Sequence, residues 1–494
     1  MPKTLEEINR KIKEGNAVVV DAEEMSLIVE EKGLAKAAKE VDVVTTGTFG
    51  AMCSSGVFLN FGYPEEPIKM QRVWLNDVEA YTGIAAVDAY LGATQLSETK
   101  GFDYGGAHVI EDLLLGKEIE LRAVSYGTDC YPKKSLKTKI TLESLNQAVM
   151  VNPRNAYQRY NVATNSSDKT LYTYMGALLP NFGNATFSGA GALSPLCNDP
   201  DYETIGIGTK IFLGGGKGYV IGEGTQHNPK AGFGTLMVKG NLKEMSAEYL
   251  KPAIFHKYGV TLYVGIGVPI PVLSESIARK TAIKDADIVT NVLDYSVAKR
   301  DRPILRKVTY EELKSGLIEI QGKEVPTSSL SSYFIAKKIA RELKNWLEKG
   351  NFLISAPLEK LPYDVVFKPM KEEIMRVKDV MLAPVITIKG GSSIREAANL
   401  IIEKNIDHLP VVSKENKILG ILTSWDISKA VLGKYRFVDE IMTEKVITAE
   451  LEESVESAAK KLQEHNISAL PVVDKEQKVV GMITTSALSK LLIK

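Results

Sequence analysis

The chain has 494 residues, too many for one hydrophobic core, so we expect two to four domains. Its composition is that of an ordinary globular protein, and the formal net charge of +0 provides no basic field that would attract nucleic acid. Three cysteines without a CxxC pair argue against a disulfide framework. No apolar run is long enough for a signal peptide or a membrane span. We therefore expect a cytoplasmic protein without a nucleic-acid or membrane partner.

Strand-like and helix-like runs alternate through the first 370 residues. The strand-like runs cover residues 16–22, 42–47 and 260–270, and the helix-like runs cover residues 26–40 and 80–93. Such alternation is typical of an α/β fold. A last helix at residues 329–350 precedes a Pro-containing linker at residues 354–369. We therefore expect one large Gly-rich α/β domain over residues 1–370, with the linker as its boundary.

Cys53 lies in a stretch of small residues, VTTGTFGAMCSSG, directly after a strand-like run. Small residues let the backbone approach a ligand, and a loop that opens a helix presents free N–H groups that stabilise a thiolate. The alternative is that Cys53 is a small buried hydrophobic residue. These residues alone leave both interpretations open.

Cys130 repeats this arrangement in AVSYGTDCYPKKS, where it follows an apolar run in a Gly/Thr turn. Lys133 and Lys134 come directly behind it, and nearby cations favour a thiolate. Cys197 is flanked by acids, which disfavour a thiolate, so we expect it to be structural. Two of the three cysteines therefore occupy strand-end loops, where reactive groups of α/β proteins are common.

Two polar segments follow these cysteines, NPRNAYQRYNVATN and EGTQH. Arg154 or Arg159 in the first can clamp a substrate carboxylate through a bidentate pair, although each taken alone is more often a surface or structural arginine. His227 in the second can move protons near neutrality, or it can be a hydrogen-bonded histidine of the Gly-rich fold. Both interpretations of each residue stay open.

Nucleotide and metal motifs are absent from this part of the sequence. The segment IFLGGGKG lacks the first Gly and the final Ser/Thr of a P-loop, and no G-x-G-x-x-G follows a strand. The glycines clustered at residues 182–235 instead predict a tight β-rich stretch. The five histidines and three cysteines show no metal-ligand spacing, so we expect no metal and no tightly bound cofactor in the first domain.

The C-terminal part contains an internal repeat with a constant offset of 61 residues between Val377 and Val438, and between the segments IDHLPVV and ISALPVV. Each copy predicts a strand, an amphipathic helix, two further strands and a closing helix, and one copy is too small to bury its sheet alone. This repeat resembles the cystathionine-β-synthase (CBS) domain pair, or Bateman module, with copies at residues 376–435 and 436–494.

The CBS resemblance implies a regulatory module for adenosine-containing ligands. The family's ribose-binding motif matches Gly420, Thr423 and Asp426 in the first copy, whereas the second copy has Ala487 in place of the acid. The resemblance therefore implies one good site per chain, with Met442, Val446 and Ile447 on the adenine side. S-adenosylmethionine, AMP or ATP would suit this site. The alternative is a module that only dimerises, and such pairs commonly associate face to face, so we expect a homodimer.

Residues 1–365 carry a second resemblance through TTGTFGAMCSSG, GGAHVIEDLLLGKEIEL, GTDCYP, NPRNAYQRYNVATN, YTYMGALLPN and GEGTQHNP. These stretches resemble the homocysteine-biosynthesis family of L-aspartate semialdehyde sulfurtransferases, one branch of which carries a CBS pair. The resemblance implies that Cys53 and Cys130 are the functional cysteines. It also implies L-aspartate semialdehyde as substrate, a sulfide donor and a ferredoxin-like reductant protein.

The implied chemistry suggests a mechanism. One of the two cysteines, preferably Cys53, carries sulfur as a persulfide that adds to the aldehyde, and the other then attacks the S–S bond. Arg154 holds the substrate carboxylate, and loop N–H groups near Gly50 or Ser54 hold the oxyanion. Two other readings remain open: an acyl transferase that uses Cys53 alone, and a nucleotide-sensing regulatory or scaffold protein without turnover.

Overall fold

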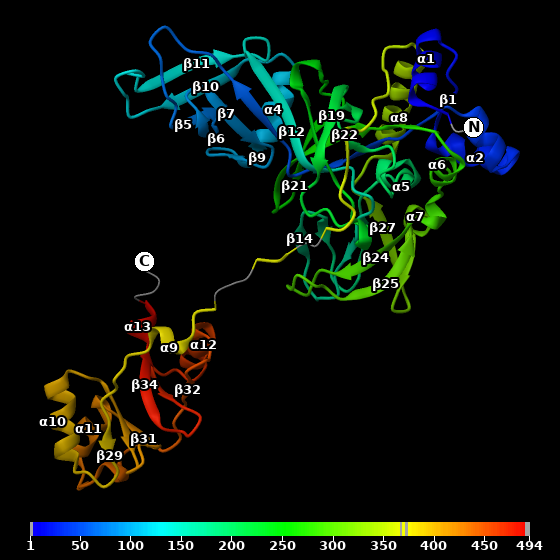
Figure 1. Cartoon of the computed structure of the whole chain (residues 1–494). Coiled ribbons are helices and arrows are strands. Elements are labelled where there is room, and N and C mark those ends of the chain that lie inside the picture. The colour runs from blue at the N-terminus through cyan, green and yellow to red at the C-terminus, as the bar shows by residue number, and fades with distance from the viewer. Residues whose placement is uncertain (1–2, 366–367, 371–373, 490–494) are drawn as a thin grey trace. The chain divides into compact units, whose positions relative to one another are not determined.

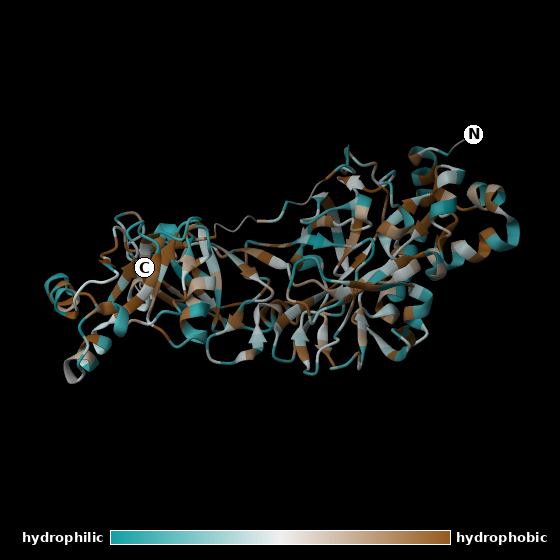
Figure 2. Cartoon of the chain, turned by 90° about the horizontal axis from the view of Figure 1, so that it is seen from below, coloured by the Kyte–Doolittle hydropathy of each residue, from teal (hydrophilic) through white to brown (hydrophobic). Residues whose placement is uncertain are grey.

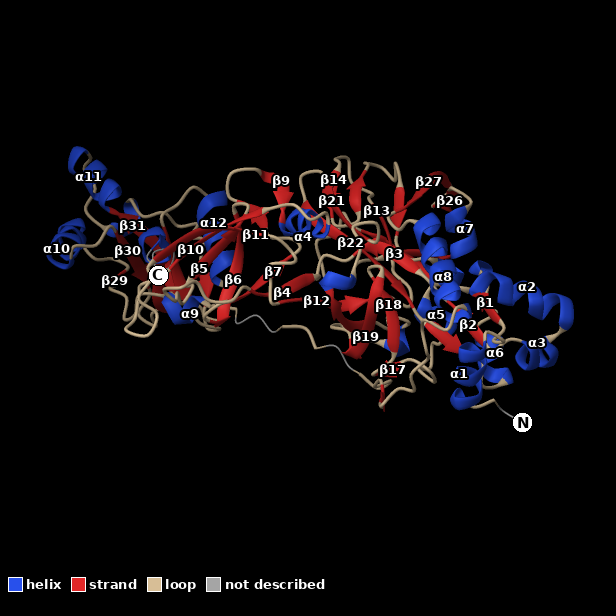
Figure 3. Ribbon diagram, turned by 90° about the horizontal axis from the view of Figure 1, so that it is seen from above, coloured by secondary structure: helices blue, strands red, loops and turns tan. Residues whose placement is uncertain are grey.

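The computed structural model describes residues 3–365, 368–370 and 374–489. The chain divides into two compact units, residues 1–367 and residues 368–494, which we describe separately (Figure 1). The expected architecture is confirmed: a large, sheet-rich α/β unit is followed by a CBS pair (Figure 3). In the described part of the chain, every helix is too short or too polar to cross a membrane.

The first unit begins with a small α/β layer. Strands β1 (Val19–Asp21) and β2 (Val43–Thr45) run parallel, and β23 (Pro269–Pro271) joins β2 in the antiparallel direction. Three short helices accompany them: α1 (Leu5–Glu14), α2 (Ala22–Lys32) and α3 (Leu34–Glu40). Capping boxes start α1 and α2, so the sequence of each helix fixes its beginning locally. Hydrophilic and hydrophobic residues both occur along these helices (Figure 2).

A large sheet fills the rest of the first unit. Its strand order is β11-β10-β5-β6-β7-β4-β12-β20-β19-β18-β22-β21, with β3 also paired to β22 and with β8 and β9 beside β6. The bounds of these strands are β3 Thr48–Ala51, β4 Gly56–Asn60, β5 Arg72–Leu75, β6 Val78–Ala85, β7 Asp88–Gly92, β8 Leu96–Ser97, β9 Gly101–Gly105, β10 Ile119–Val124, β11 Ser135–Ile140, β12 Gln147–Asn155, β18 Lys210–Leu213, β19 Gly216–Glu223, β20 Leu236–Asn241, β21 Leu250–Phe255 and β22 Gly259–Gly267.

The helix predicted for residues 80–93 is wrong, because these residues form the antiparallel pair β6 and β7. The apolar spacing of the segment suits one helix face, but its neighbours on both sides are strands. Tyr81 pairs with Tyr90 in the sheet, and Tyr90 pairs with Phe58 of β4. Pairing with β4 and β5 stabilises the extended backbone, so tertiary contacts decide the structure of this short segment.

Two helices cover the large sheet. Helix α4 (Gly106–Leu114) buries Val109, Ile110 and Leu113. Helix α8 (Tyr333–Glu348), which was predicted from the sequence, buries Ile339 and Leu343 in a cluster with Phe49 and Phe212. Because α8 packs on the strands that lead to Cys53, it helps to fix the position of that segment.

A second sheet closes one side of the first unit, in the order β25-β24-β13-β16-β27-β26. The bounds of its strands are β13 Val162–Thr164, β16 Ala185–Phe187, β24 Val289–Asp294, β25 Ile304–Thr309, β26 Leu317–Ile320 and β27 Lys323–Ser329. Helices α5 (Pro195–Asn198), α6 (Glu275–Lys280) and α7 (Tyr310–Lys314) lie in the same unit. Two strand pairs complete it: β14 (Leu171–Thr173) with β15 (Gly176–Leu178), and β17 (Gly206–Ile207) with β28 (Glu359–Lys360).

The second unit contains the two repeats. The first repeat has β29 (Ile388–Lys389), β30 (His408–Val412) and β31 (Ile418–Thr423) with helices α9 (Val377–Val380), α10 (Ile394–Lys404) and α11 (Ser424–Leu432). The second repeat has β32 (Ala449–Glu450), β33 (Ala469–Val473) and β34 (Val479–Thr484) with α12 (Val455–Glu464) and α13 (Thr485–Ser489). The repeats pack against each other through Val412, Val473 and Val479.

Candidate functional site

A cavity of about 260 Å³ contains Cys53. Its walls come from the turn after β3, the end of β12 and the segment that follows, the β14–β15 turn and the segment before β22. The lining residues are Ala51, Cys53, Ser54, Arg154, Tyr157, Tyr160, Tyr174, Met175, Ser188, Gln226, Tyr258 and Leu330. The walls therefore include both polar segments that the sequence indicated. The segment around Arg154 contributes Arg154 itself, and the segment around His227 contributes Gln226.

A tight turn presents Cys53 to this cavity. The N–H of Ser55 donates to the carbonyl of Met52 at 3.0 Å, so Cys53 and Ser54 occupy the two central positions. Within the part of the chain that the structure describes, no acceptor reaches the N–H of Cys53 or Ser54. The expectation of a helix opening here is wrong, since β4 follows. The turn nevertheless supplies two free N–H donors beside the thiol.

Hydrogen bonds hold this turn from behind. The Asn152 side chain donates to the Ser55 hydroxyl at 2.7 Å, and that hydroxyl donates to the carbonyl of Met52 at 2.7 Å. Asn152 and Ser55 are buried, so these bonds are protected from water. Asn152 also accepts the N–H of Arg154 at 2.8 Å. One buried amide thus fixes both the cysteine turn and the backbone of the cavity's arginine.

The glycines on both sides of Cys53 serve packing rather than ligand approach. A Cβ on Gly47 would lie 2.1 Å from the carbonyl oxygen of Ala336 in α8. On Gly50 it would lie 2.7 Å from the Ser331 hydroxyl, and on Gly56 it would lie 2.3 Å from the ring of Tyr90. The glycines therefore let α8 and neighbouring side chains pack closely behind the cavity, which corrects the reason that the sequence suggested for them.

Tyrosines and a threonine surround the Cys53 sulfur. The sulfur lies 3.1 Å from the hydroxyl of Thr261 on β22, which orients it. Burial raises the pKa of Tyr157, Tyr258 and Tyr263, and negative charge at Cys53 contributes to each rise. These phenols stay protonated near neutral pH and can donate hydrogen bonds. The sequence had not singled out any of them, although tyrosines are dense in the segments around residues 157–160 and 172–174.

Arg154 lies in the same cavity as Cys53, as the prediction of a carboxylate clamp requires. Its Nε is buried and has no hydrogen-bond partner among the described residues. A buried donor without a partner costs free energy, and at a cavity wall it indicates that a ligand supplies the acceptor. Its role in binding substrate stays a prediction.

Arg159 and His227 do not line the cavity. Arg159 donates to the carbonyl of Val289 at 2.8 Å and packs against Gly232. The Nδ1 of His227 accepts the N–H of Thr235 at 3.0 Å, and its Nε2 donates to the carbonyl of Pro362 at 3.0 Å. Burial lowers the pKa of His227, so the ring is neutral. This geometry favours the structural interpretation of both residues over substrate clamping and proton transfer.

The contact with Pro362 also shows that part of the linker predicted at residues 354–369 packs within the first unit. Residues 359–360 pair with β17, and Leu361 is buried, so the first part of the linker belongs to the first unit. Val366 and Phe367 lie outside the described residues. The turn that carries His227 and Gln226 therefore joins one wall of the cavity to the chain segment that leads toward the repeats.

Cys130 is exposed in the loop between β10 and β11, where its sulfur lies 3.6 Å from the Thr128 hydroxyl. Tyr131 beside it hydrogen-bonds to Tyr63, which lies just beyond the end of β4, whereas Cys53 lies just before the start of β4. The two loops are thus at opposite ends of β4, whose five residues alone span about 13 Å. A disulfide needs Cα atoms within about 7 Å. Direct attack of one cysteine on the other therefore does not fit this arrangement within one chain.

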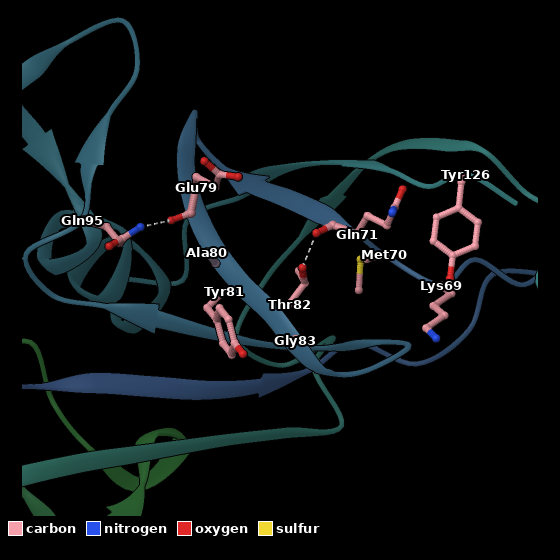
Figure 4. Close-up of a pocket in the computed structure, with 10 residues that line it drawn as sticks. All are labelled: Lys69, Met70, Gln71, Glu79, Ala80, Tyr81, Thr82, Gly83, Gln95 and Tyr126. Carbon is pink, nitrogen blue, oxygen red and sulfur yellow. Dashed lines mark hydrogen bonds between the residues drawn. The ribbon is translucent and has the colours of Figure 1, made fainter. Parts of the chain in front are cut away.

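A shallow hollow of about 600 Å³ borders the Cys130 loop (Figure 4). Tyr126 of that loop lines it together with Gln71, Glu79 and Gln95, and Gln95 donates to the carbonyl of Glu79 at 2.8 Å. Its described lining contains neither cysteine nor histidine. Although it is larger than the Cys53 cavity, its lining offers no thiol.

Cys197 differs from the other two cysteines. Burial raises the pKa of its thiol to about 12, and the thiol donates to the carbonyl of Gln158 at 2.7 Å. Such a group stays protonated and unreactive, in agreement with the structural role expected for it. In the described residues no cluster of three or more His, Cys, Asp or Glu side chains is placed to hold a metal ion.

The second unit has a cavity of about 440 Å³ that Thr423, Val446 and Ile447 line, whereas Asp426 and Met442 are not among its lining residues. Asp426 supports its wall, because one carboxylate oxygen accepts the N–H of Thr423 at 2.9 Å and the hydroxyl of Thr423 at 2.6 Å. Gly420 is needed because a Cβ would lie 2.5 Å from the sulfur of Met442. The motif thus caps α11, and the second Asp426 oxygen lies 3.8 Å from the Lys429 ammonium.

The matching cavity in the second repeat has about 610 Å³. Thr484 and Ser486 line it together with His408 and Trp425 of the first repeat. Ala487 donates its N–H to the Thr484 hydroxyl at 3.1 Å but has no carboxylate. The two repeats therefore differ in the carboxylate that the CBS resemblance assigns to ribose, since Asp426 in the first repeat corresponds to Ala487 in the second.

Comparisons with known proteins agree with this organisation. Residues 17–354 match the family described as "Homocysteine biosynthesis enzyme, sulfur-incorporation", and residues 377–433 and 438–494 each match the CBS domain. A protein of Methanosarcina acetivorans named L-aspartate semialdehyde sulfurtransferase is 58% identical over 99% of both chains. A protein of the same name from Methanocaldococcus jannaschii is 54% identical over 99% of this chain and 98% of its own.

Among solved structures, one similar chain is a CBS domain pair in complex with 5′-methylthioadenosine and S-adenosyl-L-methionine. It is 45% identical, covers 24% of this chain and 96% of its own length, and has a TM-score of 0.24.

Proposed function

The chain belongs to the homocysteine biosynthesis, sulfur-incorporation family, and we propose that it is an L-aspartate semialdehyde sulfurtransferase that makes L-homocysteine at Cys53. The observation that carries this proposal is the pairing of a nucleophile and a cation in one small cavity. Cys53 provides the sulfur chemistry, and Arg154 has a buried donor without a partner. An aldehyde that carries a carboxylate suits both groups.

The overall reaction requires electrons as well as sulfur. An aldehyde, hydrogen sulfide, two electrons and two protons give a thiol and water. If Cys53 delivers the sulfur as a persulfide, that sulfur is two electrons more oxidised than sulfide, and the reductant supplies four electrons and four protons. The persulfide's terminal sulfur adds to the aldehyde carbon, and the free N–H groups of Cys53 and Ser54 are suited to stabilise the oxyanion. Two electrons and two protons from the reductant then cleave the S–S bond and return Cys53 as a thiol. Two further electrons and two protons replace the C–OH bond by C–H and release water.

We assign Cys130 to exchange with external partners, namely the sulfur donor and a ferredoxin-like reductant protein. It is exposed, and Lys133 and Lys134 follow it in the loop. Its loop meets β4 at the end opposite to Cys53, which argues against a direct reaction between the two thiols in one chain. In this scheme Cys53 is needed for every turnover, whereas Cys130 is needed only when a protein delivers sulfur or electrons.

The test measures homocysteine formation from L-aspartate semialdehyde with polysulfide, whose sulfane sulfur can load Cys53 without an oxidant, and with a strong chemical reductant. We expect Cys53→Ala to abolish product, Cys130→Ala to retain it, and the buried control Cys197→Ala to retain it. With a protein donor and reductant, Cys130→Ala should also lose activity. Loss in Cys130→Ala with polysulfide and the chemical reductant would show that the two cysteines do react directly. No product from the wild type under any donor would overturn the proposed function.

We further propose that the CBS pair binds an adenosyl compound next to Asp426 and regulates the enzyme. S-adenosylmethionine, AMP and ATP are the candidate ligands, since the motif alone accepts each. The variant of choice is Asp426→Asn, because its side-chain oxygen still caps α11 through Thr423, whereas it cannot accept from two ribose hydroxyls. We expect the Kd measured by calorimetry to rise at least tenfold. Unchanged binding, or no binding to the wild type, would contradict the proposal.

The homodimer also remains a prediction, which sedimentation tests.

A further inference from the structure

The Cys53 cavity carries one cationic side chain but no acidic one. Among the described residues that line it, Arg154 is the charged group, and neither Asp nor Glu is present. L-Aspartate semialdehyde carries an α-ammonium group as well as a carboxylate. Arginine suits the carboxylate, but the ammonium has no carboxylate partner at the cavity walls. Some other feature of the lining must recognise that positive charge.

Four tyrosines form a continuous row of packed rings around the cavity. The ring centroids of Tyr157 and Tyr160 are 4.9 Å apart, those of Tyr160 and Tyr174 are 6.5 Å apart, and those of Tyr174 and Tyr258 are 6.2 Å apart. All four rings line the same cavity as Cys53. Tyr160 and Tyr174 form the middle of the row, away from both ends.

The substrate separates its reacting carbon from its ammonium. When the aldehyde carbon is at the outer sulfur of a Cys53 persulfide, the α-carbon lies two bonds beyond that carbon. The ammonium therefore needs a partner other than the thiol, and the rings of Tyr160 and Tyr174 line the same cavity. Ring faces attract cations, most strongly where water is excluded, and tyrosine clusters bind ammonium groups in this way.

The other polar groups of the lining are less suited to the ammonium. The Ser188 hydroxyl is already 3.1 Å from the hydroxyl of Ser331, and Gln226 lies in an exposed turn. By contrast, the Tyr174 hydroxyl is 2.8 Å from the hydroxyl of buried Tyr295, which holds its ring in place. A fixed ring loses little side-chain freedom when a ligand binds.

We propose that the rings of Tyr160 and Tyr174 form the binding site for the α-ammonium group, and so select amino-acid aldehydes over aldehydes without an amino group. This inference rests on the proposed function, because it concerns the same cavity and the same reaction. It assigns the carboxylate to Arg154, the aldehyde to Cys53 and the ammonium to an aromatic cage. Each part of the substrate then has its own partner.

The test compares L-aspartate semialdehyde with succinate semialdehyde, which differs only in lacking the amino group. The measured quantity is the ratio of kcat/KM for the two aldehydes on one preparation, with polysulfide and a chemical reductant. This ratio does not depend on the fraction of correctly folded enzyme. We expect the wild type to prefer L-aspartate semialdehyde at least tenfold.

Two substitutions at Tyr174 separate the ring from its hydroxyl. Tyr174→Phe keeps the aromatic face and should keep most of the preference, whereas Tyr174→Leu should reduce the ratio about tenfold. Tyr172→Leu is the matched control, since Tyr172 lies in the same hairpin but does not line the cavity. It should leave the ratio unchanged.

Three outcomes would overturn the cage. A wild type that uses both aldehydes equally would show that the ammonium is not recognised. An unchanged ratio in Tyr174→Leu would show that the ring does not recognise it. Equal loss of both activities in Tyr174→Phe would make the hydroxyl a proton donor instead. In each case the enzyme still converts L-aspartate semialdehyde, so the proposed function survives, whereas absence of turnover with either aldehyde would refute the function itself.

Discussion

Replacement of Arg154 by Gln should lower activity and raise stability at the same time. In the free enzyme the Arg154 Nε is buried without an acceptor, and such a donor costs about 1–3 kcal/mol. Gln removes that donor and keeps a polar side chain at the cavity wall. We therefore expect the free energy of unfolding to rise by about 1 kcal/mol.

The effect on catalysis has the opposite sign. A bidentate pair with the substrate carboxylate contains two charge-assisted hydrogen bonds, each worth about 1.5–3 kcal/mol. Gln can retain one neutral hydrogen bond, so the expected loss is about 3–4 kcal/mol, or about 10²- to 10³-fold in kcat/KM. Arg154→Lys keeps the charge but loses the planar fork, and should fall between Gln and the wild type.

The assay compares L-aspartate semialdehyde with propanal, an aldehyde without a carboxylate, while chemical denaturation reports stability. If Arg154 binds the carboxylate, Arg154→Gln loses activity toward the amino-acid aldehyde but keeps its rate with propanal. Equal loss with both aldehydes, together with a lower free energy of unfolding, would show that the arginine holds the fold. A kcat/KM within threefold of the wild type would refute the clamp outright.

Two further predictions concern the framework of the site. Gly47→Ala should lower the free energy of unfolding of the first unit, measured in urea, by about 3 kcal/mol, because the new Cβ would meet the backbone carbonyl of Ala336. Gly222→Ala is the control and should change little, because a Cβ there would have open space around it. Equal effects of the two substitutions would disprove the packing argument. Stability should also fall as the pH drops below about 6.5, because the unfolded chain then binds a proton that buried His227 excludes. The dependence of Tm on pH between pH 5 and about 6.5 should be weaker in His227→Gln than in the exposed control His465→Gln. An equally steep fall of Tm in both variants would show that His227 is not the cause.

Features set by local patterns were predictable from the sequence. The repeat of 61 residues identified the CBS pair, because the same strands and helices recur at a constant offset. The end helix that became α8 has a clear apolar stripe. Cys53 and Arg154 were selected because their chemistry is unusual in their local context, and the structure places both in one cavity.

Contacts between distant segments were not predictable in this way. The segment at residues 80–93 forms strands because its neighbours in the sheet are strands, which its own periodicity does not reveal. The tyrosines of the cavity carried no local signal, because a tyrosine in a loop reads as ordinary surface or core until its partners are known.

The sequence by itself determined which residues have reactive chemistry, because a thiol, a guanidinium and a carboxylate keep their character wherever they lie. Only the tertiary structure decided which of them act together. Cys53 and Cys130 have similar local sequences, yet the sheet places one in a closed cavity with Arg154 and the other on an exposed loop several strands away. Strand order and register are set by the burial of whole faces of the sheet, a property of the folded chain and not of either loop.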